Sequence, residues 1–107
     1  MVYVDNRAIA TNDDNGTVRT ITATAKTLSD LGFSKADIER ASSVLVHVYD
    51  ENVLWYCDGT TPVVSGNRGH LITAGTSLTL DSDENVNNLS MIAVTGTATV
   101  AITLFGG

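Results

Sequence analysis

This sequence has a single cysteine and no long apolar run. Cys57 is the only cysteine among 107 residues, so no intrachain disulfide and no cysteine-based metal site can form. Because Cys57 lies in an apolar, strand-like stretch, we expect a buried, inert thiol rather than a reactive one. No apolar run approaches the length that spans a bilayer, and the start lacks a basic segment followed by an apolar core. We expect no membrane anchor and no signal peptide, and we expect synthesis in the cytoplasm.

Basic residues are also scarce. Six Lys and Arg residues stand against twelve Asp and Glu residues, which gives a formal net charge of -6. The six are scattered along the chain, whereas nucleic-acid affinity comes largely from clustered cations that displace counterions from phosphates. We therefore expect no direct binding of DNA or RNA.

The composition predicts one all-β domain. A single proline, many threonines and an apolar share of 43% favour strands over disorder. We expect an antiparallel β-sandwich, jelly-roll-like, over residues 17–107, with residues 1–16 as an N-terminal arm or edge strand. At most one short helix is expected, near residues 35–41, where Ser34 and Asp37 resemble a capping box.

Residues 43–58 form the best-defined local unit. Two apolar runs flank the turn-prone residues Asp50-Glu51-Asn52, which predicts a hairpin in which His47 lies opposite Trp55. Both faces of such a hairpin would be largely apolar. A sheet with one wet face alternates apolar and polar residues, so the hairpin is either central to the sandwich or covered by another chain.

A second hairpin is predicted from Leu89 to Phe105, with Gly96 in the turn. Its pairing would place Met91 against Ile102 and give the ribbon a threonine-coated outer face. Between the two hairpins, glycines punctuate short apolar segments at the spacing typical of a sandwich or jelly roll.

The acidic stretch from Asp81 to Asn85 begins like a calcium-binding loop, since alternating carboxylates can converge on one cation. Val86, however, replaces the glycine of the tight turn, and Ile92 occupies the position of the closing glutamate. An acidic, solvated turn is the favoured interpretation, and no metal or cofactor is predicted.

The histidines and aromatic residues have two interpretations each. His47 is either a packed strand residue, which is favoured, or a catalytic base. His70 has no serine, cysteine or carboxylate at a sequence spacing typical of a catalytic triad, so no triad is predicted. Trp55, Tyr56 and Tyr49 form either a sugar-stacking platform or cross-strand packing partners, and packing is favoured. We therefore expect a protein that is not an enzyme.

The run from Val44 to Leu80 resembles small β-sandwich proteins of tailed-bacteriophage structural modules. In that group, an alternating strand leads into Asp-Gly-x-x-Pro, a glycine-containing turn and a segment ending in Gly-x-x-Leu-x-Leu. The strand before the Asp-Gly pair often carries an arginine where this chain has Leu54, so a contact made by that arginine does not carry over. The matching segments are Asp58-Gly59-Thr60-Thr61-Pro62, Ser65-Gly66 through His70-Leu71, and Gly75-Thr76-Ser77-Leu78-Thr79-Leu80.

The resemblance implies a virion structural protein, and most plausibly a capsid decoration or cement protein that binds the major capsid protein at the capsid surface. A homotrimer is favoured, because closed cyclic symmetry would cover the second apolar face. A receptor- or carbohydrate-binding tail module and a head-to-tail connector or neck component are the alternatives. Partner contacts are assigned to the N-terminal arm and to the first hairpin, at Tyr3, Arg7, Ile9, His47, Tyr49 and Trp55.

Overall fold

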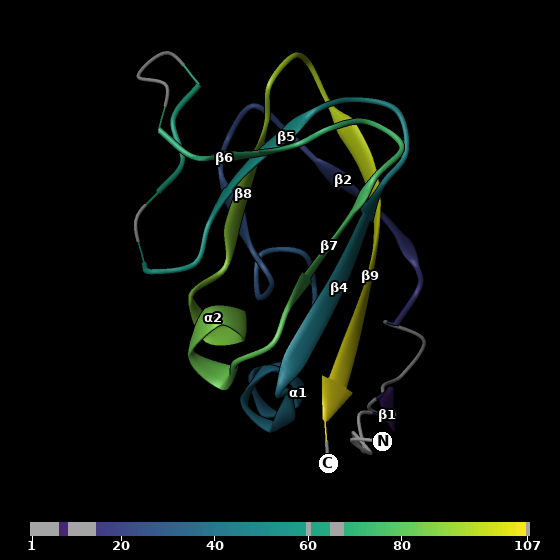
Figure 1. The fold of residues 1–107 in the computed structure, drawn as a ribbon, viewed down its shortest axis with the longest axis vertical. Helices are drawn as coiled ribbons and strands as arrows, with labels where there is room; N and C mark the ends of the chain where they lie inside the picture. The colour runs from purple at the N-terminus through teal and green to yellow at the C-terminus, as the bar shows by residue number, and fades with distance from the viewer. Residues whose placement is uncertain (1–6, 9–14, 60, 65–67, 107) are drawn as a thin grey trace, which may run out of the picture.

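The computed structural model describes residues 7–8, 15–59, 61–64 and 68–106, with residues 7 and 8 described by their backbone alone. Two antiparallel sheets lie face to face, with two short helices at one end of the stack (Figure 1). The predicted all-β fold is confirmed.

Sheet I is the larger layer. Its order is β1 (Arg7–Ala8), β9 (Ala98–Gly106), β4 (Ser43–Val48) and β7 (Ser77–Leu80), and β2 (Val18–Ile21) pairs with another stretch of β9. Burial alternates along β9 and along β4 from Val44 onward: Val46 and Ile102 are buried, whereas the neighbouring His47 and Ala101 are partly exposed on the other side. Period-two alternation therefore gives this sheet one core face and one outer face.

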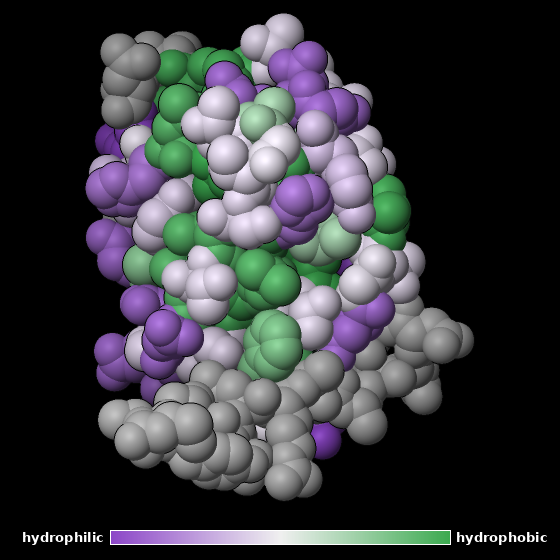
Figure 2. Space-filling model, turned by 45° about the vertical axis from the view of Figure 1, so that its right-hand side comes forward, coloured by the Kyte–Doolittle hydropathy of each residue, from purple (hydrophilic) through white to green (hydrophobic). Residues whose placement is uncertain are grey.

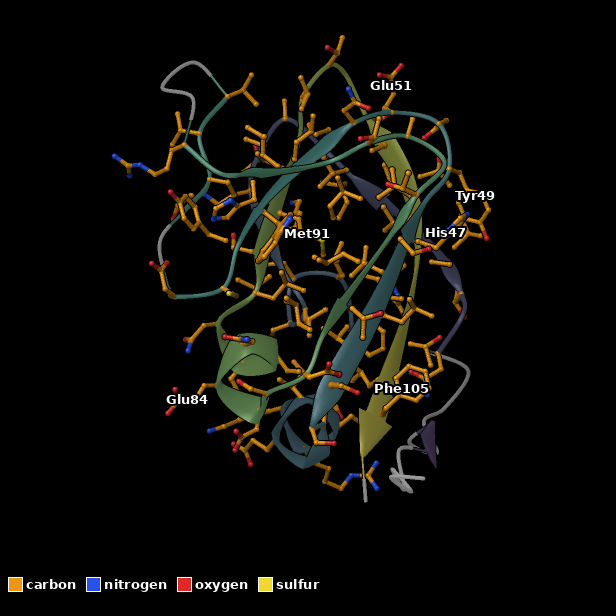
Figure 3. The ribbon with its side chains drawn as sticks, viewed as in Figure 1. His47, Tyr49, Glu51, Glu84, Met91 and Phe105 are labelled. Atoms are coloured by element: carbon orange, nitrogen blue, oxygen red, sulfur yellow. The ribbon has the colours of Figure 1, made fainter. Side chains whose placement is uncertain are left out.

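Sheet II contains shorter strands. Its order is β3 (Lys26–Thr27), β8 (Ser90–Ala93), β5 (Val53–Tyr56) and β6 (His70–Ile72). Met91 and Ala93 face sheet I and belong to the buried core. Figure 3 shows Met91 between the two layers. The core is thus a single apolar layer between the sheets, as expected for a sandwich of this size.

Both predicted hairpins are wrong. The chain leaves β4 in sheet I and enters β5 in sheet II, and it leaves β8 in sheet II and enters β9 in sheet I. His47 and Trp55 consequently lie in different sheets, and Met91 does not pair with Ile102, although both are buried in the core. The predicted turns are corners between the sheets, and the links β2–β3, β3–β4, β6–β7 and β7–β8 also cross, which gives the jelly-roll-like alternation.

Side chains fasten these corners to one another. The Asp50 carboxylate accepts hydrogen bonds from the Thr99 backbone N–H at 2.8 Å and from the Thr99 hydroxyl at 3.1 Å. The Asn52 side-chain oxygen accepts one from the Ala74 N–H at 2.8 Å. The turn-prone residues that suggested a hairpin therefore accept hydrogen bonds from backbone N–H groups at two other corners. These bonds hold a connection between two sheets instead of a tight turn between two paired strands.

Two helices close the opposite end of the sandwich. Helix α1 (Lys35–Arg40) begins as predicted, with the Ser34 hydroxyl accepting from the Asp37 N–H at 3.1 Å. Helix α2 (Asp83–Asn88) corrects the expectation of at most one helix. Its N-cap is Ser82, whose hydroxyl accepts from the Asn85 N–H at 3.0 Å. Of the acidic residues that resembled a calcium loop, Asp83 and Glu84 occupy the first turn of α2, where the helix dipole stabilises carboxylates.

Candidate functional site

The outer surface of sheet I carries apolar side chains that no described segment covers. This surface is formed by the outward residues of β2, β4 and β9 and by the residue after β4, and we define it by Val18, Leu45, His47, Tyr49 and Phe105. Val18 is 56% exposed and Tyr49 is 50% exposed. Figure 3 shows His47, Tyr49 and Phe105 on the side of sheet I that faces away from Met91.

The rest of this surface is weakly polar. Thr99 and Thr103 of β9 and Ser77 and Thr79 of β7 alternate with the apolar residues. Figure 2 shows apolar side chains grouped in the middle of this side of the molecule, among weakly polar ones. A depression of about 200 Å³, lined in part by Leu45, lies at the end of the surface next to Phe105. Asp81 is the one carboxylate among the described residues that line this depression. A surface with so few charged groups and mixed apolar character suits contact with another protein.

His47 is held in place on the outer surface of sheet I by two contacts. Its Nδ1 atom lies 2.8 Å from the Ser77 hydroxyl oxygen, and its ring meets the Tyr49 ring edge-on at a centroid distance of 4.7 Å. In the register of the sheet, His47 lies between Ala101 and Ser77. The packed interpretation of this histidine agrees with these contacts, which also restrict the orientation of the Tyr49 ring.

A second candidate site lies on the open side of the sandwich, between the edge strands β6 and β7. It is a groove of about 270 Å³ lined by residues of both sheets. Trp55 and His70 contribute aromatic rings, with centroids 5.1 Å apart, and Thr73, Thr76 and Ser77 contribute hydroxyl groups. We call this the edge groove.

The structure divides the predicted contact residues among three places. His47 and Tyr49 lie together on the outer surface of sheet I, whereas Trp55 lines the edge groove and packs partly against the core. Tyr3 and Ile9 lie outside the described residues. Arg7 is described by its backbone, which pairs with Gly106 in β1 and β9.

Sequence reasoning missed Val18, Phe105 and His70 as site residues. Val18 lies in a run of Thr and Ala whose imperfect alternation hides the outward side, and Phe105 stands at the end of a predicted half-buried ribbon. His70 joins Trp55 only through the pairing of β5 with β6, two strands separated by a long loop. No local spacing signals that contact.

The residues that the structure describes lack two further kinds of feature. No cluster of three or more His, Cys, Asp or Glu side chains forms a metal site there. In the same part of the chain, no helix has the length and apolar character needed to cross a membrane.

Comparisons with family models, curated proteins and solved structures give no match to this chain.

Proposed function

We propose that this chain is a virion structural protein of a tailed bacteriophage, and specifically a capsid decoration or cement protein. The observation that carries the proposal is the outer surface of sheet I, where Val18 and Tyr49 are at least half exposed in a small acidic domain. Exposed apolar groups that lie together on one sheet face mark a contact with another protein.

Three further features support a structural role. The alternation of the chain between two sheets is the jelly-roll arrangement that capsid domains commonly use. The net charge of -6 suits a position outside the shell, away from packaged nucleic acid. The role requires no catalytic group, metal or cofactor, and the resemblance between Val44 and Leu80 points to the same class of protein.

In this proposal, a homotrimer buries the outer surfaces of sheet I from three copies. The trimer then binds the major capsid protein through residues 1–16, with Tyr3, Arg7 and Ile9 as contacts. Binding only to the assembled shell stabilises that shell by mass action. Three linked contacts also raise the overall affinity well above that of a single arm.

The central experiment compares a serine substitution on sheet II with a serine double substitution on the outer surface of sheet I. Val18 and Leu71 are both 56% exposed, but Val18 lies on the outer surface of sheet I and Leu71 on sheet II. Sedimentation equilibrium should give a trimer for the wild type and for Leu71→Ser, and a monomer for a Val18→Ser, Tyr49→Ser double variant. The double variant should also cosediment with empty phage shells much more weakly. A solitary wild-type chain at high concentration that ignores shells contradicts the proposal.

The arm and the alternatives need separate tests. Deleting residues 1–12 should abolish shell binding while leaving the trimer intact, and retained binding would refute the role of the arm. Electron microscopy of virions separates the neighbouring roles: density over the whole lattice supports decoration. Density at one vertex supports a connector, neck or tail component instead.

A further inference from the structure

The edge groove has the size and lining of a ligand site that the proposed docking role leaves unused. Its volume of about 270 Å³ is near the lower limit of small-molecule pockets. The described side chains that line it include no carboxylate, ammonium or guanidinium group. A ligand that fits this lining is therefore small and uncharged.

The two walls of the groove offer different chemistry. Sheet II supplies the Trp55 and His70 rings. The β6–β7 corner and β7 supply the hydroxyls of Thr73, Thr76 and Ser77. An apolar ring face on one wall and hydroxyls on the other match a sugar ring, which has an apolar C–H face and hydrogen-bonding groups around its rim.

The groups on both walls are already held in place. The His70 ring lies between Trp55 and Tyr56, with centroid distances of 5.1 Å and 5.3 Å. On the opposite wall, the Thr76 hydroxyl donates to the Thr73 carbonyl at 2.6 Å, and the Ser77 hydroxyl is bonded to His47. Fixed side chains lose little conformational freedom when a ligand binds, which favours affinity.

We propose that the edge groove binds a neutral pyranose unit of a glycan. The C–H face of the sugar stacks on Trp55, and its hydroxyls bond to the His70 imidazole and to the hydroxyls of Thr73 and Ser77. An extended peptide is the less favoured occupant, because β6 and β7 have three and four residues and offer few backbone hydrogen bonds to an added strand. The groove adjoins the outer surface of sheet I at Ser77, whose hydroxyl bonds to His47, so His70 and Thr73 are the residues that test the groove apart from docking.

Trp55 is the only tryptophan, so its fluorescence reports directly on this groove. A glycan array selects the probe sugar, and titration of the full chain with that neutral saccharide should give a saturable change in Trp55 fluorescence at millimolar concentration. His70→Ala and Thr73→Val each remove one hydrogen-bonding group from an exposed residue. Each should raise the Kd by up to about tenfold, the effect of one hydrogen bond. Val18→Ser, on the other surface, should leave the Kd unchanged.

Circular dichroism of each variant shows that the fold is retained. The proposal is overturned when no neutral glycan on the array binds, or when His70→Ala and Thr73→Val both titrate like the wild type. An extended peptide that occupies the groove and perturbs Trp55 overturns it as well. Shell binding by Thr73→Val should remain normal, which keeps this result independent of the proposed decoration role.

Discussion

The two sheets treat their outward apolar residues differently. On sheet II, Ile92 faces outward and is outside the core cluster, yet it is only 8% exposed. On sheet I, Val18 also faces outward and is 56% exposed. The chain itself covers Ile92 on sheet II, although Leu71 on the edge strand β6 of the same sheet is 56% exposed. No described segment covers Val18 on sheet I to the same extent.

The connections explain part of this difference. The link between β5 and β6 covers residues 57–69, and its described parts, residues 57–59, 61–64 and 68–69, lie on the side of sheet II (Figure 1). Within it, Pro62 is buried. A Cβ atom added to Gly69 would lie 3.3 Å from the Pro62 Cβ and 2.9 Å from the Leu54 Cβ. The loop therefore packs onto the outer side of sheet II. Apolar residues on both faces of a strand thus indicate that the strand is covered, but they do not indicate what covers it.

The largest expected effect comes from truncating the two outward side chains. Ile92→Ala should lower the free energy of unfolding by about 3 kcal/mol, because a buried isoleucine leaves a cavity. Val18→Ala should lower it by less than about 1 kcal/mol, because an exposed valine loses only strand preference and minor contacts. Urea unfolding of dilute, monomeric protein measures both values.

Repeating the unfolding measurements on Val18→Ala and Ile92→Ala at higher protein concentration tests whether Val18 lies in a contact between copies. When copies associate through the outer surface of sheet I, the cost of Val18→Ala should grow with protein concentration, while the cost of Ile92→Ala should change little. Equal costs for the two substitutions in the monomer would remove the distinction between a covered and an open face.

The contact between the loop and sheet II gives a smaller effect. Gly69 has φ +138°, and an added Cβ would lie 2.9 Å from the Leu54 Cβ. Gly75 has φ +82° and open space around it, so it is a matched control for backbone strain alone. Gly69→Ala should cost about 2 kcal/mol and Gly75→Ala about 1 kcal/mol in thermal or urea unfolding. Identical losses would mean that the loop yields and does not pack tightly on sheet II.

Local patterns predicted the elements of the fold better than their partners. The strands around residues 44–48 and 53–56 follow from alternation and β-branched residues, and the Ser34 cap follows from short-range chemistry. The assignment of these strands to different sheets depends on bonds such as that from Thr99 to Asp50, which join residues 49 positions apart. No short window of sequence contains that information.

The candidate sites show the same limit. Tyr49 and His47 were predicted together because they lie two residues apart on one strand. Their separation from Trp55, and the pairing of Trp55 with His70, follow from the path of the chain between the sheets. Helix α2 was missed because its acidic first turn reads equally well as a loop until Ser82 is seen to cap it.

Asp50 allows a smaller test, at the corner where the chain passes from sheet I to sheet II. Hydrogen bonds from the Thr99 backbone and then from its hydroxyl lower the pKa of Asp50 from its ordinary 3.8. A lowered pKa in the folded state means that the ionised form stabilises the fold above the pKa of the unfolded chain, and that this stabilisation is lost as the pH falls through the folded value. Asp50→Ala should therefore have a lower unfolding midpoint than the wild type at neutral pH.

That difference should shrink as the pH falls below the ordinary pKa of 3.8 and through the lowered pKa at which the folded wild-type carboxylate gains its proton. Glu51→Ala is the matched control, since it removes one carboxylate from the same corner, and Figure 3 shows Glu51 pointing outward. It should follow the wild type at every pH in a series of urea titrations. A difference in unfolding midpoint between Asp50→Ala and the wild type that stays constant down to low pH would contradict this prediction. The charge on Asp50 would then contribute nothing to the stability of the corner, and the bonds to Thr99 would not act as charge-assisted hydrogen bonds.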